Sequence, residues 1–144
     1  MLILSGNMPR ISGVPGKTIL VVDEADVMRE ILSEMLEGMG HVVQAETSAE
    51  KALKTLVAGT ENFGLVLADL AVDAAEEELI ELTVRSEIPL VLMTVSWGPL
   101  TEEAAKARGI CKLLYKPFTR AELCEALEGV LWPPPAPGER HFSQ

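Results

Sequence analysis

Basic residues, aromatic residues and long apolar runs are scarce in this sequence. The 144 residues include 12 Lys and Arg against 22 Asp and Glu, a formal net charge of −10, and only 4% aromatics. Binding nucleic acid without sequence preference needs clustered Lys and Arg, so this balance argues against direct nucleic-acid binding. No apolar run approaches the roughly 18 to 20 residues of a membrane span, so we expect no membrane contact by this piece.

Cysteine is also rare, which excludes a disulfide framework and a cysteine-rich metal site. Cys111 and Cys124 lie in a predicted strand and a predicted helix, without CxxC or His-rich spacing around them. We therefore expect both to be small buried hydrophobes. Such sparse cysteine usage fits a reducing, cytoplasmic environment.

What the sequence does contain is enough apolar material for one folded domain. Hydrophobic residues make up 48% of the chain, which at this length supports a single core. Residues 1–16 and 132–144 are rich in Gly and Pro and predict a flexible N-terminal linker and a flexible Pro-rich tail. The folded domain is therefore expected to span 17–131.

Within that span, short β-branched runs alternate with amphipathic segments, which is typical of strand-helix units and of a parallel sheet covered on both faces. The predicted strands are 17–22, 41–46, 63–68, 89–94 and 110–115, and the predicted helices are 26–38, 48–58, 76–86, 101–108 and 119–131. Two helices begin with a capping box, Thr47 to Glu50 and Thr119 to Glu122. The fold class is α/β, a doubly wound five-stranded parallel sheet in a single domain.

The first predicted helix leaves two interpretations open. Its apolar residues, several of them methionines, spread over about half of the helix circumference, more than packing on a sheet requires. Either the whole face is buried, or one Met-rich edge stays exposed and docks a helical partner.

Polar residues follow four of the predicted strands. Asp23 and Glu24 follow the first, Asp69 the third, Thr94 ends the fourth and Lys116 the fifth. Because ligands of open parallel sheets bind beyond the carboxyl ends of the strands, we expect these side chains to meet at one edge. Clustered carboxylates repel one another unless they share a cation, and oxygen ligands suit Mg²⁺. Taken singly, each residue also has a purely structural explanation, such as a helix cap or a solvated charge.

The chain resembles the receiver domain of bacterial two-component response regulators. The resemblance covers about 17–131 and rests on Ile19-Leu20-Val21-Val22-Asp23-Glu24, on Leu65-Val66-Leu67-Ala68-Asp69, on Met93-Thr94 and on Lys116-Pro117-Phe118. It implies a flavodoxin-like fold with strand order 2-1-3-4-5. It also implies a receiver module, for example one cut from a hybrid sensor kinase.

By that resemblance, Asp69 accepts a phosphoryl group from a phosphohistidine of a sensor histidine kinase or a histidine phosphotransfer protein. Asp23, Glu24, Asp69 and the backbone carbonyl of Ala71 are the implied Mg²⁺ ligands. Thr94 and Lys116 are implied to contact the phosphoryl group, and the Lys116-Pro117 bond to be cis.

The same resemblance implies a signalling phosphoacceptor rather than an enzyme, one that catalyses at most its own phosphorylation and dephosphorylation. We expect the readout to occur through a partner, a homodimer or a larger parent chain.

Three departures from the family pattern bear on function. The loop after Asp69 lacks the usual Met-Pro pair, Val95 follows Thr94 where a smaller residue is favoured, and Leu113 replaces an aromatic residue three positions before Lys116. Tyr115 lies on the opposite face of its strand from Leu114. We expect slow turnover of the phosphoryl group and weaker or differently routed coupling to the fourth and fifth helices.

Two rival functions follow from these departures and from the fold class. One is a degenerate receiver that acts as a phosphorylation-independent protein-interaction module. The other is a Mg²⁺ phosphohydrolase of flavodoxin-like topology. The phosphohydrolase is disfavoured because the commonest motif of that class has an acid two residues after the acceptor, where this chain has Ala71.

Overall fold

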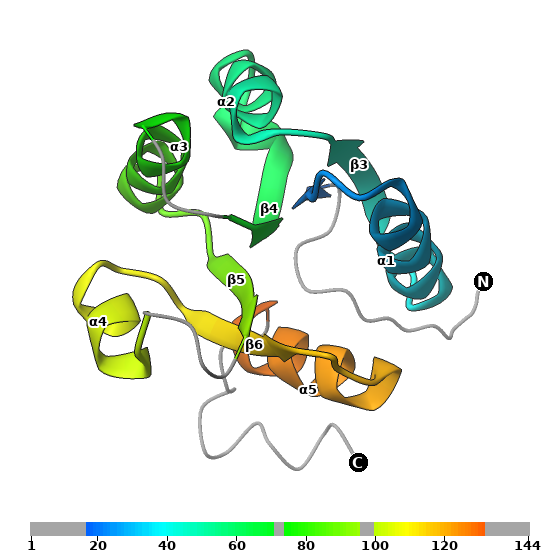
Figure 1. Ribbon diagram of the computed structural model, residues 1–144. Coiled ribbons are helices and arrows are strands. Elements are labelled where there is room, and N and C mark those ends of the chain that lie inside the picture. The colour runs from blue at the N-terminus through cyan, green and yellow to red at the C-terminus, as the bar shows by residue number, and fades with distance from the viewer. Residues whose placement is uncertain (1–16, 71–73, 96–99, 132–144) are drawn as a thin grey trace, which may run out of the picture.

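The computed structural model describes residues 17–70, 74–95 and 100–131 (Figure 1). The expected linkers, 1–16 and 132–144, lie outside the described residues, as does Ala71. Within the described ranges, no helix is both long enough and apolar enough to cross a bilayer.

The described strands form one five-stranded parallel sheet. They are β2 (Thr18–Val22), β3 (Val42–Glu46), β4 (Phe63–Asp69), β5 (Leu90–Val95) and β6 (Lys112–Lys116). Their order across the sheet is β3-β2-β4-β5-β6, and every neighbouring pair is parallel. This is the predicted order 2-1-3-4-5, so the expected doubly wound, flavodoxin-like architecture is confirmed.

Five α-helices cover the two faces of the sheet in the described residues. They are α1 (Asp26–Gly38), α2 (Ala49–Val57), α3 (Ala74–Arg85), α4 (Glu102–Ala107) and α5 (Arg120–Leu131), with a short 3₁₀ helix η1 (Thr60–Asn62) before β4. Helices α2, α3 and α4 lie on one face, and α1 and α5 lie on the other (Figure 1).

The central strand β4 shows how the sequence specifies both faces. Val66 and Ala68 pack against the cluster under α2, α3 and α4, whereas Leu65 and Leu67 pack against the cluster under α1 and α5. All four side chains are fully buried. Because each buried Leu or Val contributes about 1.5–3 kcal/mol relative to exposure, an apolar run without alternation is stable only as a strand covered on both sides.

The methionines of α1 and of its C-cap are partly buried, and the apolar residues that the helix exposes are others. Met28, Met35 and Met39 are partly buried and pack against the cluster that contains Leu32 and Leu36. The large apolar side chains that this helix exposes are Val27, 65% exposed, and Ile31, 40% exposed. The methionines therefore pack against the core rather than forming an exposed edge, although they are only partly buried.

One capping prediction is confirmed and one is wrong. At α5, the Thr119 N–H donates to Glu122 Oε1 at 2.8 Å and the Glu122 N–H donates to Thr119 Oγ1 at 3.0 Å, a reciprocal capping box. At α2, the cap is Ser48, whose Oγ accepts from the Lys51 N–H at 3.2 Å. The helix begins one residue later than the box at Thr47 requires.

The expectation of two buried cysteines is also wrong. Cys111 is exposed and Cys124 is half-buried. The physical reason for Cys111 is that β6 begins only at Lys112, so the cysteine lies outside the strand and short of its buried positions Leu113 and Leu114.

Candidate functional site

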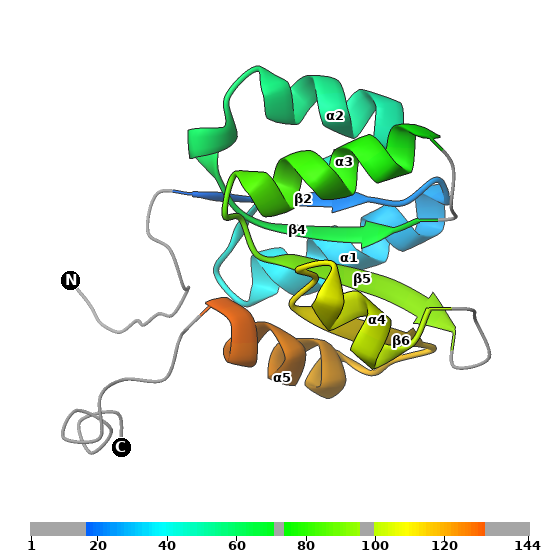
Figure 2. The same ribbon diagram turned by 90° about the vertical axis from the view of Figure 1, so that its left-hand side faces the viewer.

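The carboxyl ends of the parallel strands bring the predicted site residues to one edge of the sheet. Asp69 is the last residue of β4, Lys116 is the last residue of β6, and Asp23 directly follows β2. The strands run in the same direction in Figure 2, so these three chain positions meet at one rim. Asp69 and Lys116 are 47 positions apart in the sequence, with α3, β5 and α4 between them.

A lysine ammonium joins two carboxylates at this rim. Lys116 Nζ lies 2.5 Å from Asp69 Oδ2 and 3.6 Å from Asp23 Oδ2. The three side chains differ in exposure: Asp23 is 2% exposed, Lys116 25% and Asp69 35%. The accessible carboxylate is therefore Asp69, and the buried Asp23 lies behind the ammonium.

Asp23 is held in place by its own loop and by α1. Its N–H donates to the Glu46 carbonyl at 3.2 Å, and its Oδ1 accepts from the Ala25 N–H at 2.9 Å. Arg29 Nη1 donates to the Asp23 carbonyl at 2.8 Å, and the same guanidinium pairs with Asp26. These contacts leave Asp23 Oδ2 buried without a hydrogen-bond partner.

Glu24 and Thr94 reach the same rim without joining the lysine cluster. Glu24 is exposed and lines a pocket that Asp69 also lines. Thr94 follows Met93, the residue of β5 that pairs with Asp69 in the sheet register. The predicted five residues therefore share one edge, and three of them form a contact cluster.

The pocket beside Asp69 includes residues that sequence reasoning did not select. Its volume is about 300 Å³, and it lies between the end of β2, the start of α2, the end of β4 and the start of α3. It is lined by Val22, Glu24, Thr47, Ser48, Ala49, Glu50, Asp69, Leu70, Ala75 and Glu76. The signal for Thr47 to Glu50 was present, because α2 directly follows a strand whose carboxyl end lies at this rim.

The carboxylates at the rim have the chemistry of ligands for a divalent cation, but they are not arranged as a complete metal site. Carboxylate oxygens are the ligands that Mg²⁺ prefers, and the unsatisfied Asp23 Oδ2 is an oxygen that a cation would satisfy. Among the residues described, however, no group of three or more His, Cys, Asp or Glu side chains is arranged to hold a metal ion. The Lys116 ammonium is the positive charge that Asp23 and Asp69 share.

The cis peptide bond implied by the resemblance is present between Lys116 and Pro117. On the same strand, Leu113 is buried and Tyr115 packs with it against the cluster under α2, α3 and α4, whereas Leu114 packs on the opposite face. The expected alternation is confirmed. The Tyr115 hydroxyl lies 3.4 Å from Glu102 Oε2 in the first turn of α4, and desolvation together with this carboxylate raises the pKa of Tyr115.

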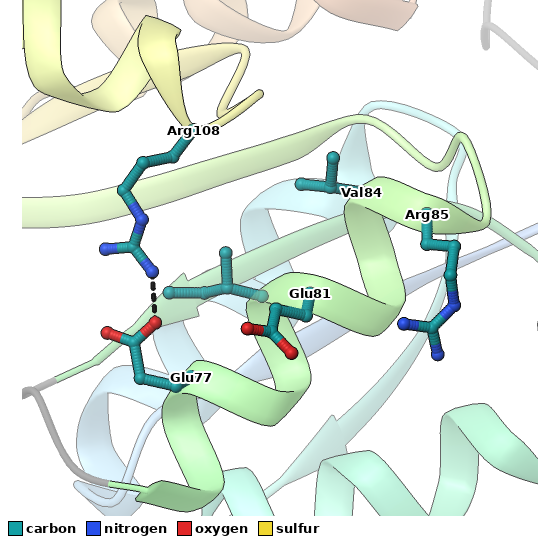
Figure 3. A pocket seen from close by; sticks show the side chains of 6 residues that line it. Glu77, Glu81, Val84, Arg85 and Arg108 are labelled. Atoms are coloured by element: carbon teal, nitrogen blue, oxygen red, sulfur yellow. Dashed lines mark hydrogen bonds and ion pairs between the residues drawn. The ribbon is translucent and has the colours of Figure 1, made fainter.

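A second pocket lies away from this cluster, on α3 and at the end of α4 (Figure 3). It measures about 510 Å³ and is lined by Glu77, Ile80, Glu81, Val84, Arg85 and Arg108. Arg108 pairs with Glu77 across it. None of the predicted site residues lines it.

Comparison with known proteins relates both the sequence and the fold to one family. The family model described as the response regulator receiver domain matches residues 19–128. A chemotaxis protein CheY homolog of Campylobacter jejuni is 29% identical over 120 residues, covering 78% of this chain and 91% of that protein. Ethylene receptor 2 of Oryza sativa subsp. japonica is 26% identical over 122 residues, covering 81% of this chain and 16% of that protein.

Solved structures show the same fold. Chemotaxis protein CheY4 of Vibrio cholerae matches with a TM-score of 0.67 and 22% identity, covering 79% of this chain and 98% of that one. A response regulator receiver domain protein of Clostridium thermocellum matches with a TM-score of 0.70 and 19% identity, covering 78% and 92%.

Proposed function

Because the chain belongs to the response regulator receiver domain family of two-component systems, we propose that Asp69 is its phosphoacceptor. The donor is a phosphohistidine of a sensor histidine kinase or a histidine phosphotransfer protein. The observation that carries the proposal is the cluster at the rim, in which Lys116 Nζ lies 2.5 Å from Asp69 Oδ2 beside an open pocket. Asp69 combines a partner cation with a side chain accessible to a donor.

The chemistry assigned to these residues is a phosphoryl transfer. A carboxylate oxygen of Asp69 attacks phosphorus, the bond from phosphorus to the donor nitrogen breaks, and the nitrogen leaves with the bonding electrons. The Lys116 ammonium orients Asp69 through Oδ2 and offsets negative charge on the transferring group. The Thr94 hydroxyl, at the same rim, is the proposed donor to a phosphoryl oxygen.

Asp23, Glu24 and Asp69 are the side chains proposed to hold Mg²⁺, with Ala71 supplying a carbonyl. Bound there, the ion supplies further charge neutralisation for the transferring phosphoryl group. The buried, unsatisfied Asp23 Oδ2 supports this assignment. Glu24 is exposed, and the described acids do not form a ready-made metal site, so the ion would have to bring these carboxylates together.

The proposed role is a signalling phosphoacceptor that catalyses at most its own phosphorylation and dephosphorylation. Phosphorylation adds about −1.5 to −2 charges to a rim that already carries several carboxylates, and that change alters contacts with a partner, a second copy or a parent chain. Its cytoplasmic location stays a prediction. The weaker coupling to the fourth and fifth helices, expected because Leu113 replaces an aromatic residue, also stays a prediction. Leu113 itself is buried.

The test is phosphorylation by a small donor in the presence of Mg²⁺, followed by intact-mass measurement. We expect a gain of about 80 Da, the mass of one phosphoryl group, in the unmodified chain. The gain should be lost in Asp69→Asn. Glu34→Gln is the control, because Glu34 is an exposed acid of α1 outside the lysine cluster and outside the contacts that hold Asp23.

Two results would contradict the assignment. Labelling that persists in Asp69→Asn would place the acceptor elsewhere. A folded chain that takes no label from any donor, including a phosphohistidine protein, would favour the degenerate receiver that acts only as a protein-interaction module.

A further inference from the structure

Arg29 ties the start of α1 back to the loop that carries two of the acids proposed to bind Mg²⁺. Its Nη1 donates to the Asp23 carbonyl at 2.8 Å, and its Nη2 pairs with Asp26 in the first turn of the same helix. The Arg29 side chain is only 17% exposed, whereas that of Asp26 is 87% exposed. The guanidinium therefore bridges the loop and the helix.

The contact with the loop restrains a peptide group rather than a side chain. The Asp23 carbonyl belongs to the planar peptide that joins Asp23 to Glu24, so a hydrogen bond to it restrains the backbone from which both side chains project. Two further hydrogen bonds hold this loop, from the Asp23 N–H to the Glu46 carbonyl and from the Ala25 N–H to Asp23 Oδ1. Asp23 Oδ2 is the oxygen that these bonds leave without a hydrogen-bond partner.

The N-terminus of α1 has no side-chain cap. Its N-cap residue is Ala25, which offers no oxygen to the N–H groups of the first turn. Helix ends fray, because their first N–H groups have no partner within the helix. Arg29 contacts both the loop and Asp26 in the first turn, so it supplies a restraint that a capping side chain would otherwise give.

We propose that Arg29 is a positioning residue for the Mg²⁺ site, because it holds the peptide between Asp23 and Glu24 and keeps Asp23 Oδ2 available to the cation. The inference rests on the Mg²⁺ assignment of the proposed function and deepens it by naming a residue that acts through the ligands. A guanidinium suits this role, since it stays charged and its planar fork donates to two oxygens at once. Removing a group that hydrogen-bonds to metal ligands typically costs about 10–100-fold in metal affinity.

The charge of Arg29 alone predicts the opposite effect. A guanidinium near a cation site repels the cation, so its removal would strengthen Mg²⁺ binding. The carboxylate of Asp26 offsets this charge locally. The direction in which Mg²⁺ affinity changes therefore separates a positioning role from simple electrostatic repulsion.

The experiment titrates Mg²⁺ into the folded, unphosphorylated chain and measures the dissociation constant by calorimetry, without a phosphoryl donor. Arg29→Met keeps an unbranched apolar stem but removes the charge and both side-chain contacts, and we expect it to raise the dissociation constant about tenfold or more. Arg29→Lys keeps the charge without the planar fork, so we expect a smaller rise. Circular dichroism at the titration temperature verifies that each variant is folded, so a loss of stability does not enter the constant.

Arg85→Met is the matched control, because it removes the same charge far from the loop. Arg85 is exposed in the last turn of α3, whose first turn contributes Ala75 to the pocket that Asp69 also lines. At about 1.5 Å per residue, Arg85 lies about 15 Å along the helix from Ala75, beyond the screening distance of about 8 Å at physiological salt. We expect its dissociation constant to equal that of the unmodified chain.

The failures of the two proposals are distinguishable. A dissociation constant that stays the same or falls in Arg29→Met would overturn the positioning role and leave the Mg²⁺ site and the phosphoacceptor in place. An equal rise in Arg85→Met would also overturn it, because the effect would then not depend on the contact with Asp23. Absence of Mg²⁺ binding by the unmodified chain, or binding that is unchanged in Asp23→Asn, would overturn both the positioning role and the Mg²⁺ assignment, whereas labelling of Asp69 tests the phosphoacceptor separately.

Discussion

The two ends of the same sheet differ in how their polar atoms are hydrogen-bonded. At the amino-terminal edge, the turns close on their own backbone: the His41 N–H donates to the Leu36 carbonyl and the Ile110 N–H donates to the Ala105 carbonyl, both at 3.0 Å. At the carboxyl-terminal rim, two carboxylates share one ammonium, and one buried oxygen of Asp23 has no hydrogen bond. Between the two ends, the central strand β4 is buried on both faces.

This difference separates the amino-terminal edge, whose hydrogen bonds stabilise the fold, from the carboxyl-terminal rim, whose polar groups are available for chemistry. Buried polar atoms are normally hydrogen-bonded, and an unsatisfied one costs about 1–3 kcal/mol. The amino-terminal edge avoids that cost through its turns. The rim retains it at Asp23, and an unsatisfied, charged group at a strand end is what a cation or a phosphoryl group would engage.

The largest effect should come from the lysine at the rim. Lys116→Met removes the cation that Asp69 and Asp23 share, so we expect phosphorylation of Asp69 to slow by about 100-fold or more. The free energy of unfolding should also fall, by about 1–3 kcal/mol, because the buried Asp23 carboxylate loses the cation beside its Oδ2. Phosphorylation rates and urea unfolding without Mg²⁺ measure the two effects.

Lys112→Met provides the contrast on the same strand. Lys112 is the first residue of β6 and is exposed, at the opposite end from Lys116. Its replacement should change stability by no more than about 0.5 kcal/mol and leave phosphorylation unchanged. If the two lysine variants behaved alike, the rim would have no special dependence on Lys116 and the contrast between the two ends would fail.

An effect on stability alone is expected at the amino-terminal edge. Gly109 precedes β6 with a φ of 88°, and a Cβ built there would lie 2.7 Å from Val84 Cγ1. Gly109→Ala should lower the free energy of unfolding by about 2–3 kcal/mol, from backbone strain together with overpacking. Phosphorylation per folded molecule should not change.

Gly40→Ala tests the backbone contribution by itself. Gly40 has a φ of 98°, but a Cβ there would have no neighbour within 4 Å. We expect a loss of about 1 kcal/mol, as measured by thermal or urea unfolding. An equal loss in both glycine variants would show that the Val84 contact contributes nothing, and a change in phosphorylation rate would link this edge to the site.

The sequence predicted the elements well because their patterns are local and strong. An unbroken apolar run such as 63–68 fits only a strand covered on both faces, and all predicted strands and helices appear within two residues of their predicted bounds. The rim residues followed from the same pattern, since a parallel topology places strand ends together. Their direct contacts, such as Lys116 between Asp69 and Asp23, were not implied by position.

The wrong predictions concern features that depend on the position of a single residue. The cap of α2 falls on Ser48 and not Thr47, and the exposure of Cys111 depends on β6 starting at Lys112. From the sequence, Glu50 was interpreted only as part of a capping box with Thr47. Its place on the wall of a pocket with Asp69 depends on how α2 and β4 come together, which no local pattern encodes.

The smallest predicted effect is a pH dependence at the amino-terminal edge. Burial lowers the pKa of His41 below its ordinary value of 6.5, so the unfolded chain binds a proton at this residue more readily than the folded chain does. Stability should therefore fall as the pH drops through about 6.5 and stop falling, as far as His41 is concerned, below its folded pKa. Urea unfolding of the unmodified chain and of His41→Gln, at pH 7.5 and pH 5.5, measures this contribution as a difference that cancels the titration of the many carboxylates. We expect the unmodified chain to lose more stability than His41→Gln over that interval.

An equal loss would mean that the amino-terminal edge contributes no titrating group to stability. The pH dependence of folding would then belong to the carboxylates, including those of the rim.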